Sequence, residues 1–132
     1  MGSDRNAGTI LLVDDDESVR ILVQRILIQQ GFHVIAARDG AEALEVASAY
    51  AEHIGLLLTD VIMPKVNGLV LARRLVQQRP GIRVLYISGY VEHSILLAKD
   101  PGSIIVQKPF TPTELIAAVR QTLASGTSGA QH

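Results

Sequence analysis

The chain of 132 residues contains no cysteine. This absence excludes disulfides, thiolate nucleophiles and zinc–thiolate sites. The four histidines never occur in the H-E-x-x-H spacing of a helical zinc site. Neither sign of charge predominates, because 12 Lys and Arg stand against 13 Asp and Glu, and no basic stripe runs along the sequence. We therefore expect no nucleic acid partner.

Long hydrophobic runs are absent as well. The longest apolar segments, such as residues 10–13 and 54–58, are far shorter than the roughly 20 residues that span a membrane. No apolar stretch of the signal-peptide type precedes Thr9. The sequence therefore predicts a cytoplasmic domain that makes no membrane contact of its own.

The composition is that of a single folded domain. Hydrophobic residues make up 48% of the chain and charged residues 19%, which is enough apolar material to bury a core. Residues 1–8 are small and polar, and residues 125–132 are rich in Ser and Gly. We predict a disordered segment or tag remnant over 1–8, a folded domain over 9–124, and a flexible tail or linker over 125–132.

Five short apolar runs alternate with segments of helical periodicity. The runs are mostly apolar on both alternating faces, which is typical of parallel strands buried on both sides of a sheet. They are Thr9–Val13, His33–Ala36, Ile54–Thr59, Arg83–Ser88 and Ser103–Val106.

The segments between these runs carry the residues that begin and end helices. In the first segment, apolar residues recur at i, i+3, i+4, i+7 and i+8 from Val19, which places them on one face of a helix. The candidate caps and boundaries are Asp39 with Glu42, Asn67 with a helix end near Arg79, and Thr111 with Pro112 and Glu114. We expect a further helix over about residues 92–98.

A β–α unit repeated five times predicts a three-layer α/β/α sandwich, with five helices covering both faces of a five-stranded parallel sheet. In such sheets, ligands bind beyond the carboxyl ends of the strands. The polar residues at these ends are Asp14–Glu17 after the first strand, Asp60 at the third, Ser88 at the fourth and Lys108 at the fifth.

These strand ends bring several carboxylates and one ammonium to a single edge. Crowded carboxylates repel each other, which raises the pKa of at least one of them unless a cation compensates. A hard divalent cation, usually Mg²⁺ where phosphate is also present, suits such oxygen ligands. Together with a lysine, the arrangement suits phosphoryl transfer to an aspartate. Taken singly, each residue has a plainer explanation as a helix cap (Asp15 or Asp16) or a turn residue (Asp60, Ser88 and Lys108).

Taken together, the residues resemble the receiver (phosphoacceptor) domain of two-component response regulators over about residues 9–124. The family implies a flavodoxin-like strand order of 2-1-3-4-5. The motifs that carry the resemblance are Asp14-Asp15, Asp39-Gly40-x-Glu42-Ala43-Leu44, Asp60-x-x-Met63-Pro64-x-x-x-Gly68, Ser88 and Lys108-Pro109-Phe110.

The resemblance implies which residues carry the chemistry. Asp60 would be the phosphoacceptor. A Mg²⁺ cofactor would be held by Asp14, Asp15, Asp60 and the backbone carbonyl of Ile62, with Asp14 acting largely through water.

It also implies which residues surround the phosphoryl group. Ser88 would be the switch residue and Lys108 the phosphoryl-binding lysine, joined to Pro109 by a cis peptide bond. Ile62 and Tyr90 lie two positions beyond the phosphoacceptor and the switch residue. They would flank the path of the water that removes the phosphoryl group.

Two finer features narrow the resemblance. Segments 86–90, 100–102 and 107–112 resemble the receiver domains attached to hybrid sensor histidine kinases. Ile105 departs from the family pattern, because the position three residues before Lys108 usually holds Tyr or Phe. A smaller side chain that is stiff at χ1 is expected to couple phosphorylation to the output face less strongly.

The resemblance implies a phosphorylation-controlled signalling switch rather than an enzyme, although the domain would assist its own phosphorylation and dephosphorylation. The phosphodonor would be a histidine kinase or a phosphotransfer domain. An output partner would bind the face formed by the fourth helix, the fifth strand and the fifth helix. Few residues follow position 124, so we expect a stand-alone receiver or one excised from a hybrid kinase, which could be tethered to a membrane.

Three alternatives remain open. A pseudo-receiver that only binds partners would typically lack some of the acidic or lysine positions, all of which are present. An aspartyl-phosphate phosphohydrolase of the haloacid dehalogenase type would carry D-x-D at the strand end, whereas Ile62 occupies the second position after Asp60. A flavodoxin-like cofactor binder would need a loop rich in Gly, Ser or Thr after the first strand, where this chain is acidic.

Overall fold

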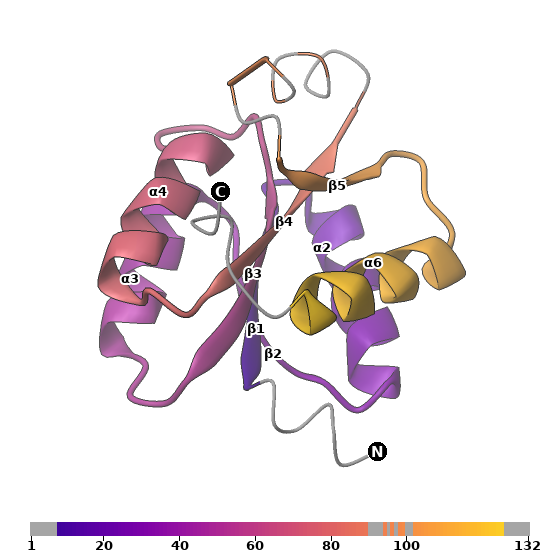
Figure 1. Ribbon diagram of the computed structural model, residues 1–132, viewed down its shortest axis with the longest axis horizontal. Coiled ribbons are helices and arrows are strands. Elements are labelled where there is room, and N and C mark those ends of the chain that lie inside the picture. Colours follow the sequence, from indigo (N-terminus) through magenta and orange to yellow (C-terminus); the bar gives the residue numbers. More distant parts are fainter. Residues whose placement is uncertain (1–7, 90–93, 95, 97, 100–101, 126–132) are drawn as a thin grey trace.

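The computed structural model describes residues 8–89, 94, 96, 98–99 and 102–125. Five parallel strands form one sheet in the order β2-β1-β3-β4-β5 (Figure 1). This confirms the fold class that the sequence pattern predicts and the strand order that the family resemblance implies. The strands are β1 (Thr9–Val13), β2 (His33–Ala37), β3 (Ile54–Asp60), β4 (Arg83–Ser88) and β5 (Ile104–Gln107).

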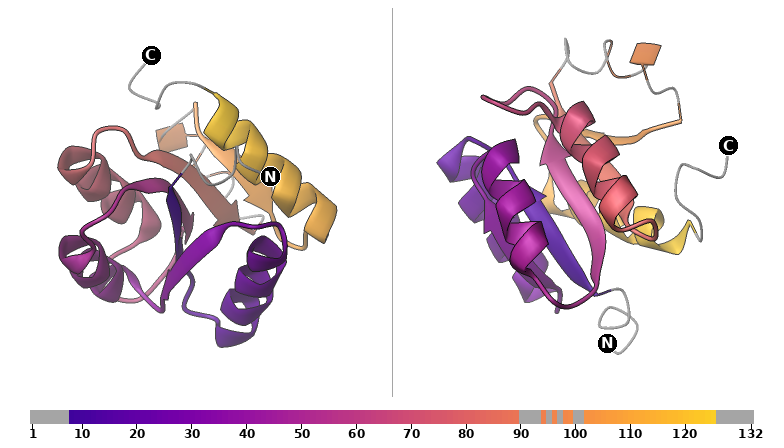
Figure 2. Two further views of the ribbon diagram at one scale, coloured as in Figure 1. Left: turned by 90° about the horizontal axis from the view of Figure 1, so that it is seen from below. Right: turned by 90° about the vertical axis from the view of Figure 1, so that its left-hand side faces the viewer.

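Helices cover both faces of this sheet (Figure 2). On one face lie α3 (Gly40–Ala49) and α4 (Gly68–Gln78), and on the other α2 (Glu17–Gln29) and α6 (Pro112–Ala124). The expected helix over about 92–98 falls mostly on residues outside the described part of the chain. No helix in the described ranges combines the length and the apolar character needed to cross a membrane.

The strands are apolar on both faces because each face packs against its own pair of helices. In β1, Leu11 and Val13 belong to the core on the α3–α4 side, while Ile10 and Leu12 belong to the core on the α2–α6 side. All five residues of β1 and all seven of β3 are buried. These two central strands therefore provide a rigid base for the residues that follow them.

A polar residue caps the N-terminus of each described helix. Asp16 caps α2, Asp39 caps α3, and Asn67 caps α4. Thr111 and Glu114 form a complete capping box at α6, as the sequence predicts. The predicted box at α3 is only half formed. Asp39 accepts from the Glu42 amide, but the Glu42 carboxylate accepts from the amide of Arg38 at 2.7 Å rather than from that of Asp39.

Four predicted boundaries, in three strands, differ from the structure. β2 extends to Ala37, and β3 extends to Asp60 because pairing with β4 continues as far as Asp60 opposite Ile87. β5 begins at Ile104 instead of Ser103 and ends at Gln107, since its last pair places Ser88 opposite Gln107. Asp60 is therefore held by the sheet itself and is not part of a turn.

Candidate functional site

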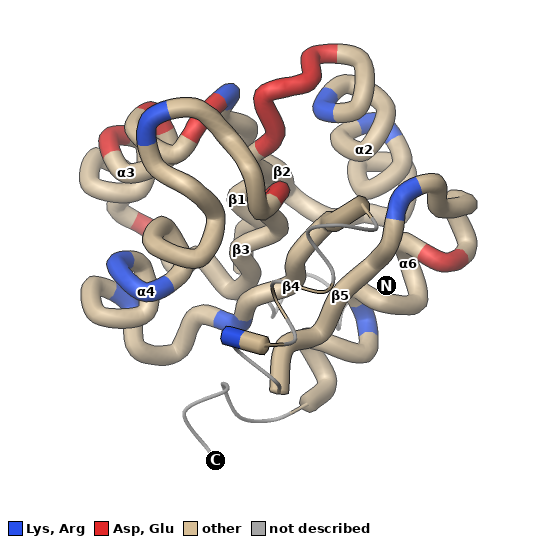
Figure 3. The backbone as a smooth tube through the Cα atoms, turned by 90° about the horizontal axis from the view of Figure 1, so that it is seen from above, with Lys and Arg blue, Asp and Glu red and all other residues tan. Residues whose placement is uncertain are grey.

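The carboxyl ends of β1, β3, β4 and β5 bring the predicted site residues to one edge of the sheet. The acidic residues that follow β1 lie at this edge (Figure 3). Asp14 follows β1 directly, Asp60 is the last residue of β3, Ser88 is the last of β4, and Lys108 follows β5. Since the strands are parallel and neighbouring, residues that are 94 positions apart in the sequence meet here because of the topology alone.

Three carboxylates converge at this edge. One carboxylate oxygen each from Asp14, Asp15 and Asp60 can be chosen so that all three lie within 4.8 Å of one another. Asp14 is fully buried and Asp60 is 8% exposed, whereas Asp15 is exposed. The site therefore has a closed inner side and an open outer side, through which a ligand can approach.

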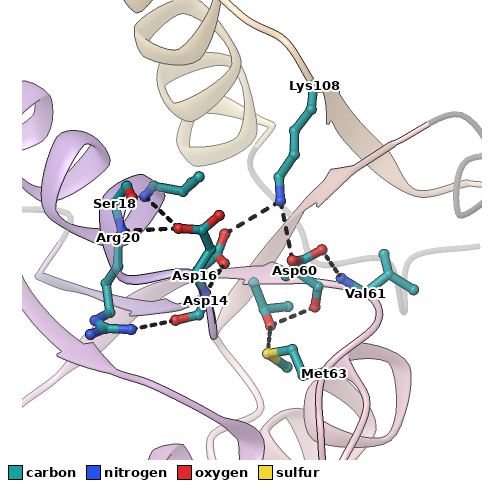
Figure 4. A network of polar contacts seen from close by, with 10 residues as sticks. Asp14, Asp16, Ser18, Arg20, Asp60, Val61, Met63 and Lys108 are labelled. Atoms are coloured by element: carbon teal, nitrogen blue, oxygen red, sulfur yellow. Dashed lines mark hydrogen bonds and ion pairs between the residues drawn. The ribbon is translucent and has the colours of Figure 1, made fainter.

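Lys108 is the cation in direct contact with two of these carboxylates (Figure 4). Its Nζ lies 3.2 Å from Asp60 Oδ2 and 3.7 Å from Asp14 Oδ2. The Asp14 Oδ2 atom is buried and accepts no hydrogen bond among the described residues. Its only polar compensation there is the ion pair with Lys108, so this oxygen retains lone pairs for a further cation.

The electrostatics of the site follow from burial and from these neighbours. Burial raises the pKa of Asp14 to about 6. The charges of Asp60 and Asp15 also raise it, against the hydrogen bond from the Asp16 amide and the charge of Lys108. Burial likewise raises the pKa of Asp60, although Lys108 opposes the rise. Burial lowers the pKa of Lys108, but the charges of Asp14 and Asp60 outweigh it and leave the pKa raised. The single positive charge of Lys108 therefore does not neutralise the negative charge of the three carboxylates.

The backbone around Asp60 is held by a compact set of contacts. The Val61 amide donates to Asp60 Oδ1 at 2.8 Å, and Thr59 Oγ1 donates to the Asp60 carbonyl oxygen at 2.9 Å. The Gly68 amide donates to the Val61 carbonyl at 2.7 Å. Thr59 Oγ1 also lies 3.9 Å from the sulfur of Met63. These contacts fix the direction in which the Asp60 carboxylate points.

Gly68 allows the start of α4 to approach the end of β3. A Cβ at position 68 would overlap the carbonyl oxygen of Asp60 and crowd the backbone of Val61. Because both obstacles are backbone atoms, no side chain can turn away to make room. Glycine is therefore required at position 68 for a steric reason, because a larger residue would displace the backbone of Asp60.

We expect Gly68→Ala to lower the free energy of unfolding by about 2 to 3 kcal/mol, because the new methyl group must push α4 away from β3. Urea denaturation measures this loss. The matched control is Gly81→Ala, since a Cβ at position 81 meets no atom within 4 Å. Equal stability of the two variants would show that the approach at Gly68 is not required.

Ser88 lies beside Lys108 at the ends of β4 and β5. The Ser88 carbonyl accepts the Lys108 amide at 2.7 Å, and the Lys108–Pro109 peptide bond is cis. Ser88 is fully buried, and its Oγ has no hydrogen-bond partner in the described part of the chain. A buried hydroxyl without a partner is costly, so its presence at this edge calls for a functional explanation.

The remaining predicted site residues differ in what the structure says of them. The Ile62 side chain is 54% exposed, two positions beyond Asp60. Ile105 is half-buried and packs against the core on the α3–α4 side. Tyr90 lies outside the described residues.

Arg20 and Thr59 contact the site although the sequence analysis did not single them out. Arg20 Nη1 donates to the carbonyl oxygen of Asp14 at 2.7 Å (Figure 4). No sequence signal marks either contact, because both end on backbone oxygens, which every residue has.

The donor set of the site fits a hard cation such as Mg²⁺. The converging ligands are carboxylate oxygens, without histidine or cysteine, and oxygen ligands are what Mg²⁺ prefers. The buried Asp14 Oδ2, which accepts no hydrogen bond among the described residues, and the excess of negative charge support the same conclusion.

Comparison with known proteins places the whole arrangement in one family. Residues 10–120 match the family described as "Response regulator receiver domain". The chain belongs to this family. Its likeness to the receiver domains of two-component response regulators, which are signalling domains, therefore extends over nearly the whole described fold.

Relatives of the receiver domain include proteins of very different length. The chain is 33% identical over 119 residues to "Sensor kinase CckA" of Brucella abortus, covering 89% of this chain but 13% of that protein. It is 31% identical over 116 residues to "Response regulator receiver protein CpdR" of the same organism, covering 86% of this chain and 95% of that protein. For "Transcriptional regulatory protein CpxR" of Escherichia coli K12, the identity is 39% over 116 residues, with coverages of 86% and 48%.

Solved structures agree with the sequence relatives. A response regulator receiver protein from Sinorhizobium medicae superposes with a TM-score of 0.78 at 34% identity, covering 89% of this chain and 94% of that one. The receiver domain of NtrX from Brucella abortus gives a TM-score of 0.76 at 29% identity, with coverages of 89% and 99%. The sequence-based identification of a receiver domain is thereby confirmed.

Proposed function

We propose that this receiver domain is a phosphorylation-controlled switch in which Asp60 accepts a phosphoryl group from a phosphohistidine. The observation that carries the proposal is the convergence of Asp14, Asp60 and Lys108 at the carboxyl ends of three strands, with Asp60 Oδ2 3.2 Å from the ammonium. The donor would be a histidine kinase or a phosphotransfer domain.

Mg²⁺ is the cofactor that we propose for this step. Asp14, Asp15, Asp60 and the backbone carbonyl of Ile62 would hold it. When bound, the ion would neutralise charge on the phosphoryl oxygens and orient them.

The chain's own residues would carry out the transfer. A carboxylate oxygen of Asp60 attacks phosphorus, the bond between phosphorus and the donor's imidazole nitrogen breaks, and the nitrogen keeps its electron pair. Lys108, whose Nζ lies 3.2 Å from Asp60 Oδ2, would stabilise the charge that develops on the phosphoryl oxygens. The buried Ser88 Oγ, which lacks a partner among the described residues, would donate to one of these oxygens once the group is in place.

The same contacts would carry the signal outward. Ser88 ends β4 and Lys108 follows β5, so movement of these residues toward a phosphoryl group would shift the ends of both strands. The affected surface would include β5 and α6. The helix over about 92–98, which the resemblance adds to this face, lies mostly outside the described residues. Ile105 of β5 is too small to report this movement as an aromatic side chain would, so we propose a muted response at that position.

The wider context of the domain is also a proposal. The match to a protein named a sensor kinase supports a receiver carried by a hybrid kinase. The match that covers 95% of CpdR supports a free-standing receiver. Against a pseudo-receiver stands the presence of every acidic and lysine position of the family motif.

Labelling by a small phosphodonor tests the proposed function. After incubation with acetyl phosphate and Mg²⁺, intact-mass analysis should show one added phosphoryl group per chain, and EDTA should prevent the addition. A chain that stays unlabelled although it is folded and binds Mg²⁺ would contradict the proposal and favour the pseudo-receiver. Continuous release of phosphate from a phosphate ester would favour the phosphohydrolase.

We predict that the phosphorylated domain is long-lived, with self-dephosphorylation over minutes to hours. Ile62 is exposed beside Asp60 and offers no atom that could orient an attacking water, and Tyr90 occupies the second position that flanks this water in the family. The variant carrying Ile62→Asn and Tyr90→Glu should lose its label on the order of tenfold faster, which corresponds to about 1.4 kcal/mol of barrier.

The lifetime is measured by following the loss of label after the phosphodonor is removed. The control is Ile28→Asn, since Ile28 is 52% exposed near the far end of α2. If the double variant and the control lose phosphate at the same rate, positions 62 and 90 do not control the water.

A further inference from the structure

Arg20 contacts the acidic site from a direction different from that of Lys108 (Figure 4). It lies four residues beyond the Asp16 cap of α2 and is half-buried. Its Nη1 donates to the backbone carbonyl oxygen of Asp14 at 2.7 Å. Lys108 therefore contacts the carboxylate of Asp14, whereas Arg20 contacts its main chain.

With the Arg20 contact, the backbone amide, the backbone carbonyl and Oδ1 of Asp14 all have hydrogen-bond partners. The Asp14 amide donates to the carbonyl of Ala37 at 3.3 Å, and Asp14 Oδ1 accepts the amide of Asp16 at 2.9 Å. With the carbonyl held by Arg20, Oδ2 is the one polar atom of this buried residue without a hydrogen bond in the described part of the chain. The contacts thus leave a single oxygen directed toward Lys108.

The Asp14 carbonyl lies beyond the last strand pairs of β1. The register of β1 ends with Val13 opposite Ala37 on one side and opposite Thr59 on the other. A buried carbonyl past the end of a ladder needs another donor, and the guanidinium of Arg20 supplies it. The Asp14 carbonyl and the Asp15 amide belong to one planar peptide unit, so holding this oxygen also fixes the orientation of the backbone at Asp15.

We propose that Arg20 is a positioning residue of the metal and phosphoryl site. By holding the Asp14–Asp15 peptide, it sets the directions in which both carboxylates face Asp60. The assignment rests on the proposed function of that site. It adds a residue from α2 to a site otherwise built from strand ends and the residues that directly follow them.

A purely structural role would be to start α2, but other residues already do so. Asp16 Oδ1 accepts the amides of Ser18 at 2.9 Å and Val19 at 3.3 Å. The Asp16 carbonyl accepts the Arg20 amide at 2.9 Å as the first helical bond. The helix start is therefore satisfied by backbone and cap, and the Arg20 side chain is free to serve the neighbouring site.

The test compares Arg20→Met with the wild type by NMR titration with Mg²⁺ alone. We expect the Mg²⁺ affinity to fall about tenfold, which is the usual effect of removing a residue that orients a metal ligand. In the metal-free protein, the carbonyl carbon resonance of Asp14 should move upfield because its hydrogen bond is lost. Arg20→Lys keeps a charged donor and should restore part of both effects.

Two controls separate positioning from charge and from stability. Arg25→Met removes the same charge from an exposed position of α2, and Val23→Ala removes packing from the buried face of that helix. Neither should weaken Mg²⁺ binding as Arg20→Met does. Equal affinity of Arg20→Met and Arg25→Met would overturn the role of Arg20, and so would an equal loss in Val23→Ala. A wild-type chain that binds no Mg²⁺ would instead overturn the proposed function on which the role rests.

Discussion

Replacing Asp60 by Asn is expected to abolish phosphorylation by acetyl phosphate completely. The amide has nearly the shape of the carboxylate and can still accept the Val61 amide, which donates to Asp60 Oδ1 at 2.8 Å. It cannot, however, supply the anionic oxygen that attacks phosphorus and forms an acyl phosphate. Intact-mass analysis should therefore show one added phosphoryl group in the wild type and none in the variant.

The control for this prediction is Asp16→Asn. Asp16 is exposed, and its carboxylate is occupied by the amides of Ser18 and Val19. An asparagine can keep this cap, so the variant should label like the wild type. Label that persists in Asp60→Asn would show that another carboxylate, such as Asp14 or Asp15, accepts the phosphoryl group.

Much of this site follows from the sequence because it depends on topology. Short apolar runs predict parallel strands, and parallel strands carry the residues after them to one edge. For that reason the residue pattern alone is enough to predict that Asp14, Asp60 and Lys108 lie together. The strand order and the individual role of each residue required the resemblance to a family.

The contacts that orient the site could not be predicted in the same way. The reach of Arg20 to the Asp14 carbonyl depends on a side-chain rotamer and on the angle at which α2 leaves β1. The length of β3 depends on its pairing with β4, which places Asp60 opposite Ile87 and so within the strand. Neither a side-chain rotamer nor a strand register can be inferred from the pattern of residue types, so both require the three-dimensional structure.

We expect the buried Asp14 carboxylate to lower the free energy of unfolding at neutral pH. Burial and neighbouring charges raise the pKa of Asp14 from 3.8 to about 6. Between these two values the folded chain binds a proton that the unfolded chain releases. The contribution of Asp14 to the free energy of unfolding therefore falls as the pH rises through this range. Above pH 6, Asp14 is ionised in both the folded and the unfolded chain, and burial of its charge lowers the free energy of unfolding by the full amount.

We expect Asp14→Asn to stabilise the metal-free protein by about 1 to 3 kcal/mol at pH 7. The upper figure corresponds to the rise of the pKa from 3.8 to about 6, which already includes the attraction of Lys108. The side-chain amide of asparagine reduces the gain, because it brings N–H donors to a buried position next to the Lys108 ammonium. At pH 4 the gain should nearly vanish, because Asp14 is then protonated in the folded wild type. Urea denaturation at several pH values measures both.

Added Mg²⁺ should reverse the order of stability of these two proteins. A cation that binds only the folded chain stabilises it by mass action, so Mg²⁺ should raise the midpoint of the wild type. It should do little for Asp14→Asn, which lacks one ligand and the buried oxygen that has no hydrogen bond among the described residues. Asp16→Asn serves as the control and should follow the wild type in both respects, because Asp16 is exposed. If Asp14→Asn were less stable than the wild type at pH 7 without metal, Asp14 would be a structural residue. The raised pKa of Asp14 would then no longer support the proposal that this residue binds a cation.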